Sequence, residues 1–251
     1  MSQTGQVPSP AAVSSVAHVV VDSIEAAQLS VADHHHVARV LRARPGESVT
    51  VTDGRGSWRA GVVPADWSDA SIGLANLGPV YQLGRSGGRV AERCVAIALA
   101  KADKPETAVQ KLTELGIDRV VLLTAAHSVV KWDADKIAKN LARLRSISRE
   151  AVMQSRGVWL PSIEGVFSPA QFVESEQRLG RRVAMAQFGG ETVMAKVDTI
   201  LIGPEGGWSP SELAGCVSRV HLAGNVLRAE TAAIAAGVLL LHASEIHGLQ
   251  D

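Results

Sequence analysis

The sequence predicts an α/β protein in which a small β-barrel module precedes a larger domain with a mainly parallel sheet. Residues 17–81 contain short extended runs separated by turns, and a glycine-rich stretch at residues 82–90 is typical of a linker. After it, apolar strand-like runs alternate with helical patterns, as in βαβ units. We therefore expect a disordered tail over residues 1–16, the barrel module over 17–85 and the α/β domain over 86–251.

Three extended segments and one short helix make up the predicted barrel module. The segments VVVDSI (19–24), ESVTVTDG (47–54) and SWRAGVV (57–63) are rich in β-branched residues or alternate between apolar and polar side chains. Between the first two lies DHHHVARVLRAR (33–44), whose apolar residues recur at helical spacing. We expect Asp33 to cap this helix.

The α/β domain contains five apolar runs that read as strands. They are CVAIALA (94–100), DRVVLLT (118–124), RVAMAQF (182–188), TILIG (199–203) and VHLA (220–223). Helices are expected between Asp103 and Gly116, over residues 134–154, after the capping box Ser209-Pro210-Ser211-Glu212, and from Glu230 onward.

Composition excludes several classes of protein. Cys94 and Cys216 are the two cysteines of the 251 residues, which rules out a disulfide scaffold or a zinc ribbon. The longest apolar run, residues 232–241, is too short to cross a membrane, and the first fifteen residues lack the features of a signal peptide. Three adjacent histidines, residues 34–36, do not converge easily on one ion. We expect a cytoplasmic protein with neither membrane nor metal partner.

The net charge of zero hides two basic clusters. Between residues 39 and 59, five arginines accompany only two acidic residues, Glu47 and Asp53. Residues 101–156 carry eleven basic and seven acidic groups, whereas residues 157–251 carry six basic and ten acidic groups. Each cluster is either a solvated charged face or a phosphate-binding surface, because phosphate binding depends on local rather than net charge.

Two glycine-containing turns are the candidate ligand-binding segments of the sequence. LIGPEGGWSPSE (201–212) and LAGNVLRAETAA (222–233) each read as a strand end, a tight turn and a helix start. Such strand ends are the usual ligand site in open α/β sheets, although either turn alone is also compatible with a purely structural connection. The phosphate loop G-x-x-x-x-G-K-[ST], the dinucleotide fingerprint G-x-G-x-x-G after a strand and the hydrolase elbow G-x-S-x-G do not occur in the sequence.

These turns belong to a set of motifs that spans nearly the whole chain. The set comprises HHHVARVLRARPGE (34–47), KADKPETAVQKLTELGIDRV (101–120), EAVMQSRGVWLPSI (150–163), GPEGG (203–207) and VLRAETA (226–232). With them the sequence resembles the RsmE-type enzymes of the SPOUT methyltransferase class, which methylate N3 of a uridine in 16S (small-subunit) ribosomal RNA. It departs from the family pattern at Ala223 and Asn225, where Gly and Arg are common, and at Met153, where Glu is common.

The resemblance implies a PUA-like RNA-binding barrel followed by a SPOUT-type parallel-sheet domain with a trefoil knot, assembled as a homodimer. The implied cofactor is S-adenosyl-L-methionine, and the partner is 16S ribosomal RNA or the small ribosomal subunit. By position in the motifs, the implied cofactor-binding residues are Met185, Gln187, Leu201, Gly203, Glu205, Gly207, Leu222, Gly224, Val226 and Leu227.

Transfer of a methyl group to uracil N3 requires that the N3 proton leave and that the resulting charge be stabilised. We expect Arg228 to stabilise that charge and Glu230 or Glu205 to accept the proton, although Glu230 is also placed to cap its helix. The expected RNA-binding residues are Arg39, Arg42, Arg44, Arg149 and Arg156, of which Arg156 is equally suited to reach a partner subunit's pocket. Two alternatives stay open: a noncatalytic ribosome-assembly factor with a decayed pocket, and a SPOUT enzyme acting on ribose or guanine.

Overall fold

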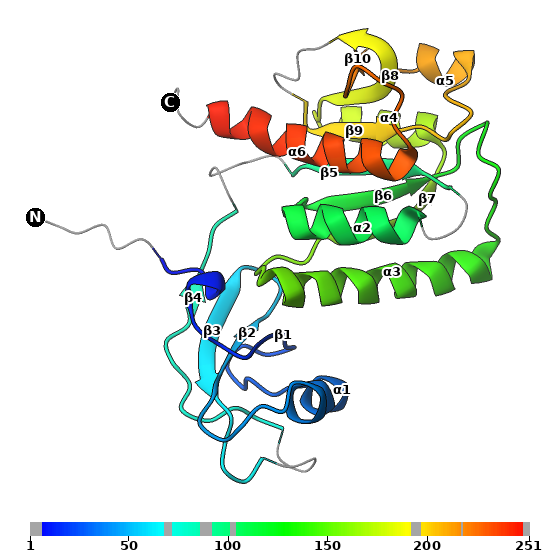
Figure 1. The fold of residues 1–251 in the computed structure, drawn as a ribbon. Helices are drawn as coiled ribbons and strands as arrows, with labels where there is room; N and C mark the ends of the chain where they lie inside the picture. Colours follow the sequence, from blue (N-terminus) through cyan, green and yellow to red (C-terminus); the bar gives the residue numbers. More distant parts are fainter. Residues whose placement is uncertain are drawn as a thin grey trace, which may run out of the picture. The chain divides into compact units, whose positions relative to one another are not determined.

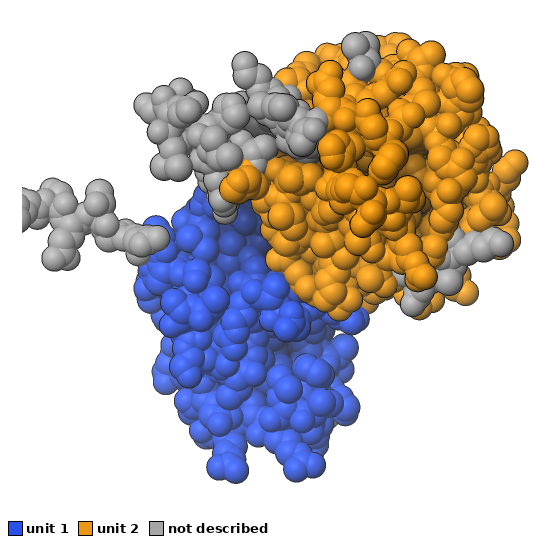
Figure 2. All heavy atoms as spheres, turned by 45° about the horizontal axis from the view of Figure 1, so that its top comes forward, with its two compact units in different colours: residues 1–85, 149–160 blue, residues 86–148, 161–251 orange. Residues whose placement is uncertain are grey.

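The computed structural model describes residues 7–67, 72–85, 92–100, 104–191, 197–216 and 218–247. The chain forms two compact units, shown in two colours in Figure 2. Unit 1 comprises residues 1–85 and 149–160, and unit 2 comprises residues 86–148 and 161–251. Residues 149–160, which the sequence assigned to the second domain, therefore belong to the first unit.

Unit 1 is built around a four-stranded sheet in the order β1-β2-β3-β4. The strands are β1 (Ala17–Val20), β2 (Ser48–Thr52), β3 (Ser57–Val62) and β4 (Tyr81–Gln82). β1 runs parallel to β2, and the other two pairs are antiparallel. Val19, Val49 and Val51 form the centre of the core, since alternate side chains of a strand point to the same face.

Part of the segment expected to be a disordered tail is structured. A short 3₁₀ turn, η1 (Pro10–Ala12), buries Pro10. The backbone carbonyl of Pro8 accepts a hydrogen bond of 3.1 Å from the indole Nε1 of the buried Trp58. The prediction of a disordered tail was wrong for these residues. Their polar composition does not show that the buried indole N–H of Trp58 needs an acceptor and finds it in the carbonyl of Pro8.

The helix predicted over residues 33–44 begins earlier and changes its winding. It consists of α1 (Val31–His35), which continues as a π-helical turn, η2 (His36–Val40). Ser30, not Asp33, is the N-cap, and its Oγ accepts a hydrogen bond of 3.1 Å from the backbone N–H of Asp33. The Ser30 hydroxyl in turn donates to the Asp33 carboxylate over 2.5 Å, so a serine and an acid three residues apart close the first turn together.

Unit 2 contains a six-stranded, all-parallel sheet in the order β10-β8-β9-β5-β6-β7 (Figure 1). The strands are β5 (Cys94–Ala98), β6 (Arg119–Leu123), β7 (Ser162–Phe167), β8 (Val183–Glu191), β9 (Thr199–Ile202) and β10 (Ser218–Val220). All of these except β7 were predicted from the sequence, although β10 overlaps the predicted run 220–223 only at Val220. Every residue of β5, β6 and β9 is buried, as expected for strands covered on both faces.

Five helices cover the two faces of this sheet. They are α2 (Lys104–Leu115), α3 (Ala134–Ser155), α4 (Pro169–Arg178), α5 (Pro210–Ala214) and α6 (Ala229–His247), of which α4 was not predicted. Val95 and Ile97 of β5 pack with α2, α3 and α6 in one hydrophobic cluster, while Cys94 and Ala96 pack with α4 in another. No helix in the described ranges combines the length and the hydropathy needed to cross a bilayer.

Candidate active site

A cavity of about 370 Å³ opens at the carboxyl ends of the three neighbouring strands β9, β8 and β10. It is lined by three segments, namely residues 186–188 within β8, residues 202–208 without Gly206 at the end of β9 and in the turn after it, and part of residues 221–232 after β10. Both motif-bearing turns therefore meet in one place. Because parallel strands bring their carboxyl ends to one edge, segments far apart in the chain can build a single pocket.

The turn after β9 is held in a fixed shape by contacts around glycines. The backbone N–H of Gly207 donates a hydrogen bond of 2.8 Å to the carbonyl of Pro204, and Gly207 has a φ of +73°, where glycine is favoured. The indole of Trp208 lies against Gly203, where an added Cβ would be only 3.0 Å from Cε2. Its Nε1–H donates over 3.0 Å to the carbonyl of Ala186, which ties this turn to β8.

The helix that follows this turn is anchored from a second side. Ser209 and Glu212 form the predicted capping box, and the other Glu212 oxygen accepts a hydrogen bond of 2.8 Å from the backbone N–H of Ala126, in the loop after β6. Burial of the Glu212 carboxylate opposes its ionisation, but the hydrogen bonds from Ser209 and Ala126 outweigh it and lower its pKa. The turn is thus held from two sides, by β8 and by the loop after β6.

Most of the sequence-predicted cofactor-binding residues line the cavity. Those that do are Gln187, Gly203, Glu205, Gly207, Leu222, Val226 and Leu227. Met185 and Leu201 are fully buried in β8 and β9 and pack in the core beneath it. Gly224 is exposed and is not among the lining residues. Trp208 and His221 also line the cavity and were not predicted from the sequence, because their place depends on which strands are neighbours.

Two side-chain oxygens, one of an amide and one of a carboxylate, are buried at this end of the sheet without a hydrogen-bond donor in the described part of the chain. One is Oε1 of Gln187, which lines the cavity, and the other is Oε2 of Glu230, in the first turn of α6. A buried acceptor without a donor is costly, and in a native protein it calls for an explanation, of which a catalytic or ligand-binding role is one. The place of these two atoms at the cavity end of the sheet favours that explanation for them.

The charged candidates gather beside the cavity. Glu205 forms an ion pair with Lys104, the first residue of α2, and this hydrogen bond raises the pKa of the Lys104 ammonium. The charges of Glu230 and Arg228 also act on Lys104, in opposite senses. Of the predicted catalytic residues, Glu205 lines the cavity, and Arg228 and Glu230 lie on either side of Ala229, which lines it as well. Lys104 was not predicted from the sequence.

The five predicted RNA-binding arginines fall into two groups. The side chains of Arg39, Arg42 and Arg44 are exposed, and no hydrogen bond or ion pair of theirs occurs among the described residues. The guanidinium of Arg149 instead binds both carboxylate oxygens of Asp33, at 2.9 and 2.7 Å. That of Arg156 donates to the hydroxyl and the carbonyl of Ser15, at 2.5 and 2.7 Å, so this second group is engaged within unit 1.

The three adjacent histidines, residues 34–36, differ in their surroundings. His34 is buried and its ring lies edge-on to Trp67, with ring centroids 4.5 Å apart, whereas His35 and His36 are exposed. No cluster of three or more histidine, cysteine or acidic side chains arranged to hold a metal ion occurs in the described ranges.

Comparison with known proteins assigns this architecture to a class. Residues 89–241 match the RNA methyltransferase domain family and residues 30–64 match the RNA methyltransferase PUA domain. The protein is thus an RNA methyltransferase with an N-terminal PUA domain. It is 32% identical over 228 residues to the ribosomal RNA small subunit methyltransferase E of Mycobacterium tuberculosis, with 80% of each chain covered. The chain belongs to the ribosomal RNA small subunit methyltransferase E family.

Solved structures agree with this assignment. An enzyme from Porphyromonas gingivalis, described as a "probable rRNA-methyltransferase", superposes with a TM-score of 0.73 at 27% identity, over 92% of this chain and 98% of that one. A methyltransferase from Legionella pneumophila, solved with bound S-adenosylmethionine, gives a TM-score of 0.75 at 24% identity with the same coverage, which shows a shared fold.

Proposed function

We propose that this protein uses S-adenosyl-L-methionine to methylate N3 of a uridine in the 16S ribosomal RNA of the small subunit. Family membership supports the class of reaction, and the cavity where the two motif-bearing turns meet supports the site. The observation that carries most weight is the pair of donor-less buried oxygens, on Gln187 and Glu230, at the carboxyl edge of the sheet.

The residues of the cavity suit the proposed cofactor. In this proposal the backbone groups of residues 222–227, five of which line the cavity, bind the adenine ring, and Gly207 lets the turn after β9 approach the ribose closely. The free amide oxygen of Gln187 is an acceptor for ribose hydroxyl or amino groups. When bound, S-adenosylmethionine supplies a methyl group made electrophilic by the positive sulfur. Ala223 and Asn225 line this same cavity and leave it open, so their departure from the family pattern does not favour a decayed pocket.

Two side chains at the start of α6 perform the proton chemistry in this proposal. Arg228 is exposed and positive, and it stabilises negative charge on the uracil carbonyls. Glu230 accepts the N3 proton, since its buried oxygen has no donor among the described residues, whereas Glu205 is already bonded to Lys104. The structure thereby supplies a reason to prefer Glu230 over Glu205 as the base.

The proposal also covers RNA binding, the topology of the chain and its assembly. Arg39, Arg42 and Arg44 of the PUA domain form the RNA-binding surface, because their guanidinium groups remain available to phosphates. We further propose that the loops after β8, β9 and β10 form a trefoil knot and that the enzyme is a cytoplasmic homodimer. The half-exposed Val238 on the apolar helix α6 supports a contact with a second copy.

Mass mapping of methylated 16S ribosomal RNA is the decisive test. The enzyme should be incubated with small subunits or RNA that lack the modification. It should add one methyl group, which fragmentation in the mass spectrometer locates on N3 of a uridine. Methylation of ribose or guanine would assign a different reaction. Arg228→Ala should lower kcat by about 10²-fold or more while S-adenosylmethionine still binds in calorimetry. Near-wild-type turnover of this variant would remove Arg228 from the mechanism, and absence of cofactor binding to the wild type would contradict the enzyme itself.

A further inference from the structure

Lys104 occupies a position from which it can act on the substrate. It begins α2, the helix that follows β5 in the chain, and β5 lies next to β9 in the sheet. Its Nζ therefore reaches Glu205 in the turn after β9, although the two residues are 101 positions apart in the sequence. Its side chain is 27% exposed, so one ammonium faces both the cavity turn and solvent.

The ion pair with Glu205 leaves capacity on the ammonium. A lysine ammonium has three donor hydrogens, and Glu205 takes one of them. No other hydrogen bond of Nζ occurs among the described residues. Glu205 lines the cavity, and so does Ala229, which stands between Arg228 and Glu230 in the chain. The pair with Glu205 therefore holds the ammonium beside a cavity residue.

We propose that Lys104 is a further catalytic residue of this enzyme, whose ammonium, held in place by Glu205, stabilises the uracil anion together with Arg228. The proposal rests on the function proposed above. Uracil has two carbonyl oxygens flanking N3, and removal of the N3 proton spreads negative charge over both. Two cations approaching from the starts of different helices match these two oxygens better than one cation does.

The bond changes balance without any further reactant. The N3–H bond breaks and its proton passes to the Glu230 carboxylate, while Lys104 and Arg228 hold the charge on the two carbonyl oxygens. The N3 electron pair then forms the bond to the methyl carbon. The electron pair of the broken carbon–sulfur bond stays on sulfur and neutralises its positive charge. Glu230 releases its proton to solvent after the product leaves.

The variant Lys104→Met tests the proposal, since it keeps the length of the side chain and removes its charge. We expect kcat to fall by about 10²-fold, with the affinity for S-adenosylmethionine and the KM for RNA within about twofold of wild type. The loss should shrink as the pH rises, because a more alkaline solution ionises N3 without help from the cation. Lys104→Arg should restore most of the rate. A wild-type rate for Lys104→Met, or a loss that is the same at every pH, would overturn the proposal.

Lys111→Met is the matched control. Lys111 lies on the same helix and forms a comparable ion pair with a glutamate, at 2.8 Å, but its partner Glu114 belongs to α2 itself, whereas Glu205, the partner of Lys104, lines the cavity. This variant should leave kcat unchanged. A rate that falls as far as in Lys104→Met would mean that charge on α2 in general is responsible, and would likewise overturn the proposal.

A double-mutant cycle with Glu205→Gln separates charge stabilisation from mere positioning. If Lys104 contacts the uracil, its removal should still lower the rate when Glu205 is already neutral, so the double variant is slower than either single one. If Lys104 serves only to position Glu205, the double variant is no slower than the single variants, and the proposal is wrong. Wild-type enzyme that does not methylate uridine N3 would refute the proposed function instead, which keeps the two failures distinct.

Discussion

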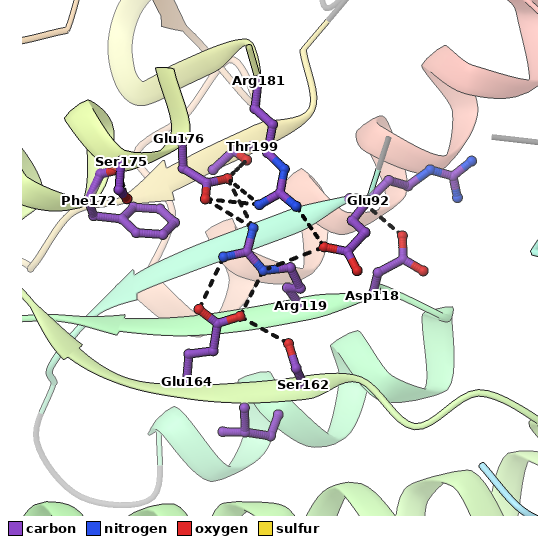
Figure 3. A network of polar contacts seen from close by, with 12 residues as sticks. Glu92, Asp118, Arg119, Ser162, Glu164, Phe172, Ser175, Glu176, Arg181 and Thr199 are labelled. Atoms are coloured by element: carbon purple, nitrogen blue, oxygen red, sulfur yellow. Dashed lines mark hydrogen bonds and ion pairs between the residues drawn. The ribbon is translucent and has the colours of Figure 1, made fainter. Parts of the chain in front are cut away.

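The two ends of the unit 2 sheet contain polar clusters of opposite character. At the amino ends of the strands, Arg119 of β6 and Glu176 of α4 lie at the centre of a network of ion pairs (Figure 3). At the carboxyl ends lies the cavity, with its donor-less oxygens on Gln187 and Glu230. One cluster satisfies its central charges from within the protein, and the other leaves acceptors open. This difference separates residues that stabilise the fold from residues that await a ligand.

The amino-end network has the geometry of a structural ion cluster. Glu176 is 1% exposed and accepts hydrogen bonds of 3.0 Å from Arg119, Arg181 and Thr199. Arg119 also binds Glu164 of β7 through two contacts of 2.8 and 3.1 Å. Burial of Arg119 favours its neutral form, but these carboxylates outweigh it and raise its pKa. Breaking such a cluster leaves a buried charge without compensation.

The largest expected effect follows from neutralising the centre of this network. Glu176→Gln should lower the free energy of unfolding by about 3–5 kcal/mol, because two arginines lose their shared counter-charge in a buried setting. Urea denaturation measures the change. At a temperature where the variant is folded, its methylation rate and cofactor affinity should match the wild type. A variant as stable as the wild type would show that the network does not hold the fold.

Glu174→Gln on the same helix is the control for that variant. Glu174 pairs with Arg178 one turn away, but both side chains are largely exposed, at 62% and 74%. An exposed pair of this kind is worth about 0.5 kcal/mol or less. A loss as large as that of Glu176→Gln would attribute the effect to charge on α4 rather than to burial.

The same substitution at the opposite end of the sheet should give the reverse pattern. Glu230→Gln should lower kcat by about 10²-fold or more, as expected for loss of a general base. Stability should change by no more than about 1 kcal/mol, because the lost attraction to the helix amino terminus is offset by removing a buried, donor-less charge. Single-turnover methylation and urea denaturation measure the two effects. A stability loss like that of Glu176→Gln, with catalysis intact, would assign Glu230 to the fold.

The contrast between the two ends was only half visible in the sequence. The cavity end was predictable because two motifs follow predicted strands. GPEGG supplies glycines and a carboxylate, and VLRAETA supplies an arginine and a glutamate at the start of a helix. The network was not, because Arg119, Glu164, Glu176 and Thr199 lie in four elements that become neighbours only through the strand order. Lys104 was not predicted for the same reason. Its partner Glu205 follows β9, which comes late in the chain but lies beside β5 in the sheet.

The arginines show a further limit of sequence reasoning. Composition ranked Arg42, Arg149 and Arg156 alike, as members of basic clusters. Whether a guanidinium faces solvent or a carboxylate depends on tertiary contacts, and Arg149 meets Asp33 across 116 residues. The density of charge along the sequence therefore predicts a candidate RNA-binding surface. Which of its arginines remain available to RNA depends on the tertiary contacts that each of them makes.

The smallest expected effect separates two arginines with the same unusual backbone. Arg42 and Arg156 each follow a helical segment with a positive φ, of 55° and 56°, which costs a residue other than glycine about 1 kcal/mol or more. Arg42→Gly should remove this cost and raise stability by up to about 1 kcal/mol. It should also weaken RNA binding severalfold and reduce the slope of log K against log salt by about 1, as for one lost phosphate contact.

Arg156→Gly relieves the same strain but loses both hydrogen bonds to Ser15. Hydrogen bonds from a charged donor are worth about 1.5–3 kcal/mol each, so this variant should be less stable than the wild type while its salt slope stays unchanged. Unfolding and RNA titrations over a salt series measure both quantities for both variants. If Arg42→Gly binds RNA with the wild-type salt slope, the guanidinium of Arg42 makes no phosphate contact. The basic surface of the PUA domain must then be sought among Arg39 and Arg44 alone.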